Sequence, residues 1–234
     1  MKAMTPVDRL LTDLRAIFAT RLVSLVVYGR HASGAAPRGV PIHTLALVEG
    51  LSFPDLEACG RVSSRWLSDG FAVPLIINRS EFARSLDVFP LEFGAIIDAH
   101  TVVHGPDPFD GLRVSDADLR RACEVDLKGH LLHLREAYIE RHGELDGIAG
   151  LVESSAPALR TLVGNVARLD GHHPQTEGAL AAYLAGALGP THERALTAVL
   201  SLTMSAVSAG DAAKMYPAYL SAVEALSAYV DAWQ

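Results

Sequence analysis

Two apolar segments separated by a glycine-rich loop constrain the fold of this chain more than any other feature. Residues 22–28 and residues 42–48 are short, rich in β-branched side chains and nearly continuous in apolar character. This pattern is typical of strands that are covered on both faces. Residues 29–41, which separate them, hold three glycines and two prolines and therefore predict a loop.

Helices are predicted on either side of these strands. Thr5 can cap a helix that begins at Pro6, and apolar residues then recur at helical spacing. Ser52 begins a second helix that runs to about Asp69, where Gly70 ends it. The two strands are thus preceded by one helix and followed by another.

The rest of the first half predicts further short elements. Residues 72–78 fit a third strand, Ser80 caps a short helix, and residues 90–98 and 101–104 are weaker strand candidates. This order of elements predicts an α+β fold in which a small mixed sheet carries helices on one face.

The second half of the chain predicts helices alone. It follows the turn-rich residues 105–108 and starts with a capping pattern at Ser115. The predicted helices cover about residues 115–138, 144–169, 176–188, 191–208 and 212–233. We therefore expect an α/β domain over residues 1–112 and an all-α helical bundle over residues 113–234.

Composition excludes several classes of function. The net charge is −7, and the sequence pI is about 5.8, which argues against a dedicated nucleic-acid binder and against attachment to anionic lipid. The chain lacks an apolar run long enough to span a membrane, and its start lacks the features of a signal peptide, so we expect a cytoplasmic protein without a membrane partner. Cys59 and Cys123 lie far apart and are expected to be buried free thiols.

The two strands and their loop resemble the nucleotidyltransferase superfamily, which has the DNA polymerase β-like fold. In that family one strand ends in Gly-Ser, and the next strand opens with two aspartates separated by one residue. Here Gly29 matches the family glycine, Arg30 replaces the serine, and Ile42 and Thr44 occupy the aspartate positions. The resemblance covers about the first hundred residues and implies the nucleotidyltransferase-like fold for them.

The resemblance also implies that this chain lacks the metal-binding aspartates of the family. Family members place triphosphate on the glycine turn and hold two divalent cations with the paired aspartates. No Asp or Glu lies between Gly34 and Val48, so no shift of register restores the pair. We therefore expect no catalytic residue, no bound metal or other cofactor, and the loss of metal-dependent nucleotidyl transfer.

A nucleotide or phosphate pocket is still expected at the turn. The residues assigned to this pocket are Gly29, Arg30, Ser33, Arg38 and Thr44. Such a protein would act as a nucleotide-binding module, or as a module that binds a protein partner or forms a homodimer.

Two alternatives stay open. The first is an active nucleotidyltransferase that uses Mg²⁺ and a nucleoside triphosphate on a small molecule such as an aminoglycoside, on a protein or on RNA. It would need carboxylates from elsewhere, such as Glu92 and Asp98. The second is a structural or regulatory helical protein without enzymatic activity.

Histidines of the second half carry weaker signals. His130 and His133 share a helix face and are expected to form a surface or half-buried pair rather than a metal site. Arg168 and His173 resemble the Arg-x4–6-His element of helical ribonuclease-like domains. A Gly-His-His-Pro turn separates them, however, which argues against a ribonuclease.

Overall fold

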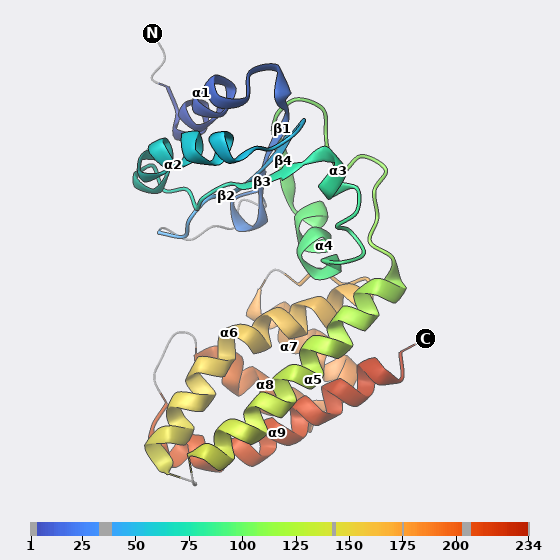
Figure 1. Cartoon of the computed structure of the whole chain (residues 1–234). Helices are drawn as coiled ribbons and strands as arrows, with labels where there is room; N and C mark the ends of the chain where they lie inside the picture. The colour runs from blue at the N-terminus through green and yellow to red at the C-terminus, as the bar shows by residue number, and fades with distance from the viewer. Residues whose placement is uncertain (1–3, 33–38, 142–143, 175, 203–206, 234) are drawn as a thin grey trace. The chain divides into compact units, whose positions relative to one another are not determined.

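A computed structural model describes residues 4–32, 39–141, 144–174, 176–202 and 207–233 of the chain (Figure 1). The chain divides into two compact units, Met1–Ser115 and Asp116–Gln234. Each unit has its own secondary structure and its own buried apolar residues.

Unit 1 is built on a four-stranded mixed sheet with the strand order β3-β2-β1-β4. The strands are β1 (Leu22–Tyr28), β2 (His43–Val48), β3 (Leu75–Asn78) and β4 (His100–His104). β1 pairs antiparallel with β2 and with β4, whereas β3 runs parallel to β2. The predicted small mixed sheet is confirmed.

One face of the sheet is covered by α1 (Pro6–Phe18) and α2 (Phe53–Ser68), which lie side by side (Figure 1). Both helices begin as predicted, because Thr5 and Ser52 each form a capping box with an aspartate three residues later. The buried residues of this core are Leu10, Leu14, Phe18, Leu22, Leu25, Ala46, Val48, Cys59, Trp66 and Phe71.

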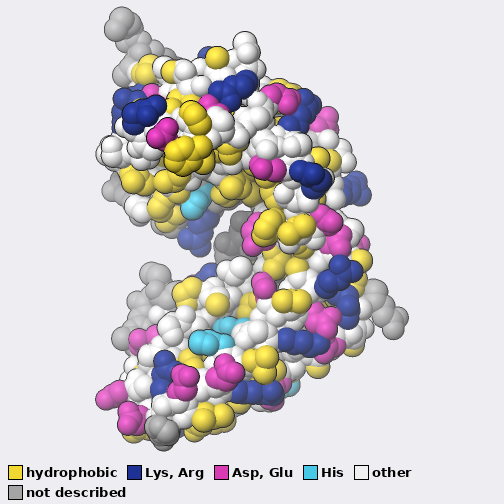
Figure 2. Space-filling view, viewed as in Figure 1, with side chains coloured by type: hydrophobic (Ala, Val, Ile, Leu, Met, Phe, Trp, Pro, Cys, Tyr) yellow, Lys and Arg dark blue, Asp and Glu magenta, His cyan; other side chains and the backbone are white. Residues whose placement is uncertain are grey.

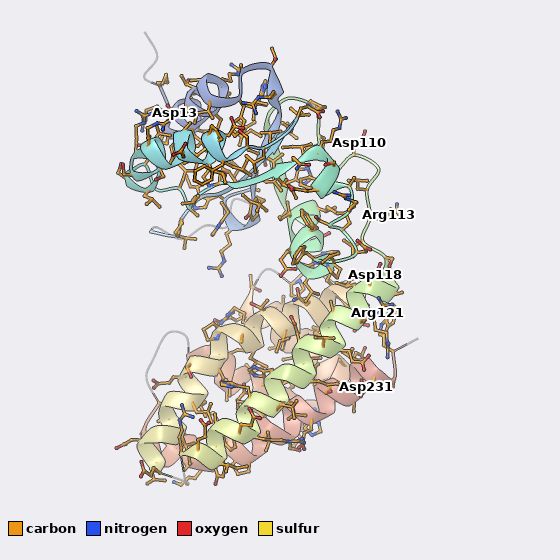
Figure 3. All side chains as sticks on the ribbon, in the orientation of Figure 1. Asp13, Asp110, Arg113, Asp118, Arg121 and Asp231 are labelled. Atoms are coloured by element: carbon orange, nitrogen blue, oxygen red, sulfur yellow. The ribbon has the colours of Figure 1, made fainter. Side chains whose placement is uncertain are left out.

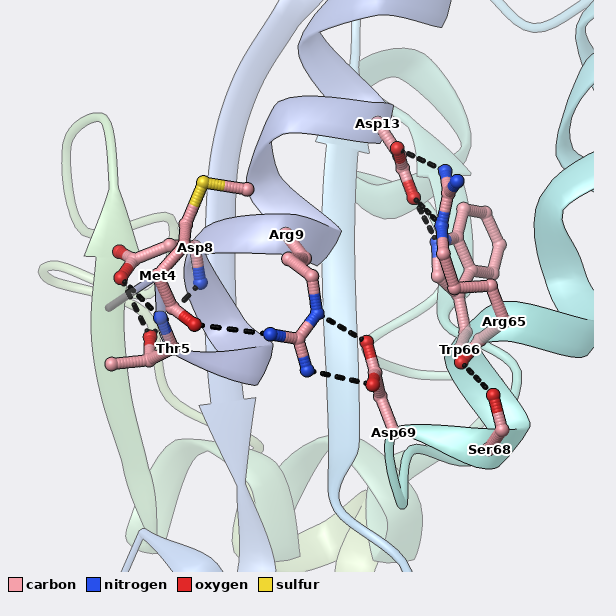
Figure 4. Close-up of polar contacts among 9 residues, drawn as sticks. All are labelled: Met4, Thr5, Asp8, Arg9, Asp13, Arg65, Trp66, Ser68 and Asp69. Carbon is pink, nitrogen blue, oxygen red and sulfur yellow. Dashed lines mark hydrogen bonds and ion pairs between the residues drawn. The ribbon is translucent and has the colours of Figure 1, made fainter.

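Asp13 links α1 to α2 at the edge of this core. Its carboxylate accepts a hydrogen bond from the indole Nε1 of Trp66 at 2.9 Å and forms an ion pair with Arg65 (Figure 4). The Trp66 side chain is buried, so its polar nitrogen requires such a partner. Asp13 therefore completes the packing of the two helices.

The opposite face of the sheet carries α3 (Arg79–Phe82) and α4 (Pro90–Asp98). Its buried core consists of Val26, Leu45, Leu47, Ile77, Phe82, Phe93, Ile96 and Phe109. Helical residues therefore cover both faces of the sheet, and the prediction of a single covered face is wrong.

Two local predictions in this region are also wrong. Residues 90–98 form α4 instead of a strand, with Pro90 in the first turn, where its missing N–H costs no helical hydrogen bond. Asn78 caps α3 in place of Ser80, because the Asn78 side chain accepts the Glu81 N–H at 2.9 Å.

Unit 2 is a helical bundle, as predicted. It contains α5 (Asp116–Glu140), α6 (Leu145–Leu169), α7 (Glu177–Leu188), α8 (Pro190–Ser201) and α9 (Ala209–Asp231). In the part of unit 2 that the structure describes there is no strand. Asp231, labelled in Figure 3, ties the end of α9 to α5 through an ion pair with Lys128 at 3.1 Å.

None of the described helices combines the length and the apolar character that crossing a membrane requires. Cys59 and Cys123 are both buried and free, as predicted.

Candidate functional site

The candidate site lies where β1 ends, at the short 3-10 turn Gly29–His31. Gly29 has a φ of +72°, a backbone conformation that favours glycine. Its N–H donates to the carbonyl oxygen of Ala99 at 2.7 Å. Gly29 therefore shapes the turn, and its own amide is already used within the fold.

The turn carries two basic residues. The Arg30 side chain is exposed, whereas His31 is half-buried and its Nε2 lies 2.9 Å from the carbonyl oxygen of Val40. Because a carbonyl oxygen only accepts hydrogen bonds, Nε2 of His31 is the donor in this contact. Ser33 and Arg38, assigned to the same pocket from the sequence, lie outside the described residues.

Thr44 lies apart from the surface of this turn. It is buried at 1% exposure, and the side-chain alternation of β2 places it on the α1/α2 face, with Ala46 and Val48. Ile42 also packs against the α1/α2 core. The two positions assigned to the family's aspartates therefore face the core between the sheet and its first two helices.

His43 occupies the neighbouring position of β2 and points to the other face. It is exposed, pairs in register with Tyr28, and its ring centroid lies 5.7 Å from that of Tyr28. His43 was not among the residues predicted for the pocket from the sequence. The alternation of β2 could have found it, since Leu45 and Leu47 share its face, but only once that face was known.

His100 of β4 lies on the other side of Tyr28. Its Nδ1 is 2.9 Å from the carbonyl oxygen of Ile97, and its Nε2 is 3.2 Å from Oδ2 of Asp107. Partial burial raises the pKa of Asp107, but hydrogen bonds from the Phe109 N–H and from His100 outweigh this effect and lower the pKa overall. His43, Tyr28 and His100 thus form a row across the sheet beside the turn, which we call the imidazole row.

Carboxylates are sparse at this site. Asp98 is the last residue of α4 and is exposed, one residue before the Ala99 carbonyl that binds the Gly29 N–H. Glu92 is exposed in the first turn of α4. The described residues include no group of three or more His, Cys, Asp or Glu side chains that could hold a metal ion. The residues of this site therefore do not fit a pair of divalent cations, which need several oxygen ligands.

A separate pocket of about 650 Å³ opens in unit 2, around Asp170 at the end of α6. One carboxylate oxygen accepts hydrogen bonds from the hydroxyls of Tyr183 at 2.6 Å and Tyr229 at 2.8 Å. The other accepts the indole N–H of Trp233 at 2.8 Å. Burial and the bond to Asp170 raise the pKa of Tyr183, so its hydroxyl stays a donor.

The pocket is lined by aromatic, acidic and small side chains. The rings of His172 and Tyr183 lie 5.6 Å apart at its wall. His173 also lines the pocket. Arg168, the other residue of the ribonuclease-like element, donates from Nη1 to Oδ1 of Asn165 at 2.9 Å. Small side chains of α7 complete the lining, and these are Ala179, Ala182, Gly186 and Ala187.

Charges of both signs are mixed on the face that Figure 2 shows. Figure 2 shows basic and acidic side chains interspersed on the visible face of each unit. This arrangement agrees with the acidic pI, because a nucleic-acid footprint is expected to be a basic patch.

Comparison with known proteins identifies the fold. No protein-family model and no curated protein sequence matches the chain. Among solved structures, the chain is similar to spectinomycin adenyltransferase AAD(9) from Enterococcus faecialis, determined with ATP and spectinomycin. The TM-score is 0.57 at 11% sequence identity, and the match covers 97% of this chain and 98% of that chain. The chain has the nucleotidyltransferase fold.

The match confirms the predicted resemblance and extends it. The sequence carried the resemblance only over about the first hundred residues, whereas the structural match to a nucleotidyltransferase spans nearly the whole chain, including the helical bundle. An identity of 11% shows the fold alone, so activity, ligands and site residues are the subject of proposals.

Proposed function

We propose that this chain is a nucleotidyltransferase-fold protein that binds a nucleotide at the end of β1 and has lost metal-dependent nucleotidyl transfer. The observation that carries this proposal is the chemistry of β2 beside the Gly29 turn. Its site-facing residue is His43, and no carboxylate occurs between Gly34 and Val48. Asp98 beside the turn and Asp107, which already contacts His100, supply too few oxygen ligands for two divalent cations.

Retention of nucleotide binding is supported by the donors at the turn. Arg30 is exposed, and His31 and His43 bring two imidazoles to the same end of β1. Arginine and protonated histidine are among the side chains that bind phosphate oxygens. The structure of spectinomycin adenyltransferase AAD(9) was determined with ATP, which makes a nucleotide the first ligand to test.

The test measures binding and transfer on the same protein. Calorimetric titration should detect ATP binding, and Arg30→Gln should weaken it, since one phosphate-binding cation is removed. The matched control is Arg113→Gln, which removes an exposed arginine elsewhere in unit 1 (Figure 3). Incubation with labelled ATP, Mg²⁺ and a broad panel of acceptors should release no pyrophosphate. Magnesium-dependent release that requires an acceptor would refute the proposal.

A second candidate function is supported by the pocket of unit 2. Asp170 supplies a negative charge, and the rings of His172, Tyr183 and Tyr229 supply aromatic surface, a combination that suits an organic cation. The chain would then be an active transferase whose acceptor is a small amine, and spectinomycin is the first acceptor to test because AAD(9) was determined with it.

This candidate makes different predictions. Equilibrium dialysis should show binding of spectinomycin or a related amine, and Asp170→Asn should weaken it by about tenfold, as expected for one charge-assisted contact. Pyrophosphate release should depend on Mg²⁺ and should be lost in Asp98→Asn. Binding of the amine without any release would leave the first proposal standing and reject the second.

A further inference from the structure

We propose that the site beside Gly29 binds polyphosphate without a metal ion and that protonated His43 supplies the positive charge a metal would otherwise provide. This inference rests on the proposed nucleotide binding and specifies how the ligand is held. It follows from the residues found at this site, where β2 carries His43 in place of a carboxylate and the described residues form no group that could hold a metal ion.

His43 is placed for this role by the register of the sheet. It pairs with Tyr28, the residue directly before Gly29, and its side chain is exposed on the face opposite α1 and α2. In the part of the chain that the structure describes, no hydrogen bond or ion pair engages the His43 ring. Both of its nitrogens are therefore available to a ligand.

The charges around His43 make its protonation matter. Arg30 and His31 lie on the turn, and Asp98, at the end of α4, is the nearby acid. On the far side of Tyr28, the carboxylate of Asp107 lies 3.2 Å from Nε2 of His100 and is a further acid of the row. Among the described residues, neutral His43 thus leaves the site with one arginine against two carboxylates, whereas protonated His43 balances them and gives an anion a second cationic donor beside Arg30.

Other groups of the row do not replace this charge. Burial raises the pKa of Tyr28, so its phenol stays neutral at and below neutral pH. The Nε2 of His31 already donates to the Val40 carbonyl oxygen. A polyphosphate that approaches the turn would therefore meet in His43 an exposed imidazole with both nitrogens open.

The pH dependence has a definite sign. An ordinary histidine is mostly protonated at about pH 5.5 and mostly neutral at about pH 7.5. An anion that binds only the protonated form should therefore bind about tenfold more tightly at the lower pH, in the ratio of the protonated fractions.

The experiment titrates the full chain with trimetaphosphate and with ATP, each in EDTA and in Mg²⁺, at about pH 5.5, 6.5 and 7.5. Trimetaphosphate keeps a constant charge over this range, so any pH dependence belongs to the protein. Three variants are compared with the unmodified chain: His43→Gln, His43→Arg and the control His133→Gln, whose histidine is exposed on α5 of unit 2.

The expected result is binding in EDTA that tightens about tenfold from pH 7.5 to pH 5.5. His43→Gln should bind weakly at every pH, His43→Arg should bind tightly at every pH, and His133→Gln should behave as the unmodified chain does. Binding that requires Mg²⁺, or a pH dependence that His43→Gln retains, overturns the inference and leaves nucleotide binding intact. Failure to bind ATP under any condition rejects the proposed function itself, and with it this inference.

Discussion

Arg9 and Asp69 join the first two helices of unit 1 through two parallel hydrogen bonds. Nε of Arg9 lies 2.8 Å from Oδ2 of Asp69, and Nη2 lies 2.7 Å from Oδ1 (Figure 4). Arg9 is in the first turns of α1, and Asp69 caps the end of α2. The hydrogen bonds from Arg9 lower the pKa of Asp69, so the folded state favours the ionised carboxylate.

Replacement of Asp69 by Asn should therefore destabilise unit 1 at neutral pH and much less in acid. Because the pKa of Asp69 is lowered on folding, its stabilising effect is present above the ordinary aspartate pKa, about 3.9, and is lost as pH falls through the folded value. Urea unfolding at several pH values measures the difference between the two proteins. Glu49→Gln, which breaks an exposed pair with Arg79, is the control and should change little. A pH-independent difference would contradict the assignment.

Substitution of Gly105 by Ala should be among the most damaging changes in unit 1. Gly105 has a φ of +76°, and a Cβ there would lie 2.0 Å from the carbonyl oxygen of Val23. Strain and clash together should lower the free energy of unfolding by about 3 kcal/mol or more. Gly111→Ala is the matched control, since Gly111 has a φ of +72° but open space around it, and it should cost about 1 kcal/mol. Equal losses of unfolding free energy in the two variants would show that the backbone shifts and relieves the clash with the Val23 carbonyl oxygen.

Ala19 offers a stabilising change. It is exposed at the end of α1 with a φ of +51°, which is unfavourable for a residue with a Cβ. Ala19→Gly should raise the free energy of unfolding by about 1 kcal/mol. Ala16→Gly, within α1, should instead lower it by about 1 kcal/mol. Thermal or urea unfolding checks both signs, and a loss of stability in Ala19→Gly would contradict the prediction.

His130 should make unit 2 sensitive to acid. Burial, with a smaller effect of His133, lowers the pKa of His130 to about 4, and its Nε2 lies 2.8 Å from the hydroxyl of Tyr219. The unfolded chain takes up a proton near pH 6.5 and the folded chain does not, so stability falls as pH decreases from about 6.5 toward 4. After allowance for partial exposure, the loss should be about 2 kcal/mol.

Unfolding of His130→Gln at pH values across this range tests the assignment. Glutamine can still donate to Tyr219 but does not titrate, so the variant should lose most of this acid sensitivity. His133→Gln removes only the smaller effect and should retain most of it. Identical pH dependence in His130→Gln and the unmodified chain would show that another group is responsible.

Cys123 should be unreactive while unit 2 is folded. Burial, together with the charge of Asp126, raises the pKa of its thiol to about 12. In the variant Cys59→Ser, a thiol reagent at mildly alkaline pH should react only after denaturant is added. Fast reaction of the native variant would mean that the bundle opens locally around α5.

The sequence predicted most elements because their signals are local. Capping residues such as Thr5 and Ser52 fix helix starts, and apolar β-branched runs fix the central strands. The strand predicted for residues 90–98 was wrong because a short apolar run fits a buried strand and a buried helix equally well. Only the packing of Phe93 and Ile96 into the core beneath α4 distinguishes the two.

The site was predicted less well for a geometric reason. The turn at Gly29 and Arg30 was predicted because a glycine after an apolar strand is a signal in the sequence itself; their role in a site stays a prediction. The choice between Thr44 and His43 depends on which face of β2 is covered by α1 and α2, and a one-residue difference exchanges the two faces. That information lies in the tertiary packing and not in the segment.

The two tryptophans of the chain lie in different units, and both indole nitrogens donate to a carboxylate, Trp66 to Asp13 and Trp233 to Asp170. The protein therefore contains one tryptophan in each half, and excitation that avoids the six tyrosines reads it alone. Trp233→Phe leaves emission that reports only the sheet and its helices, and Trp66→Phe leaves emission that reports only the bundle. Denaturation followed in this pair of variants would reveal whether the two halves melt together or one after the other.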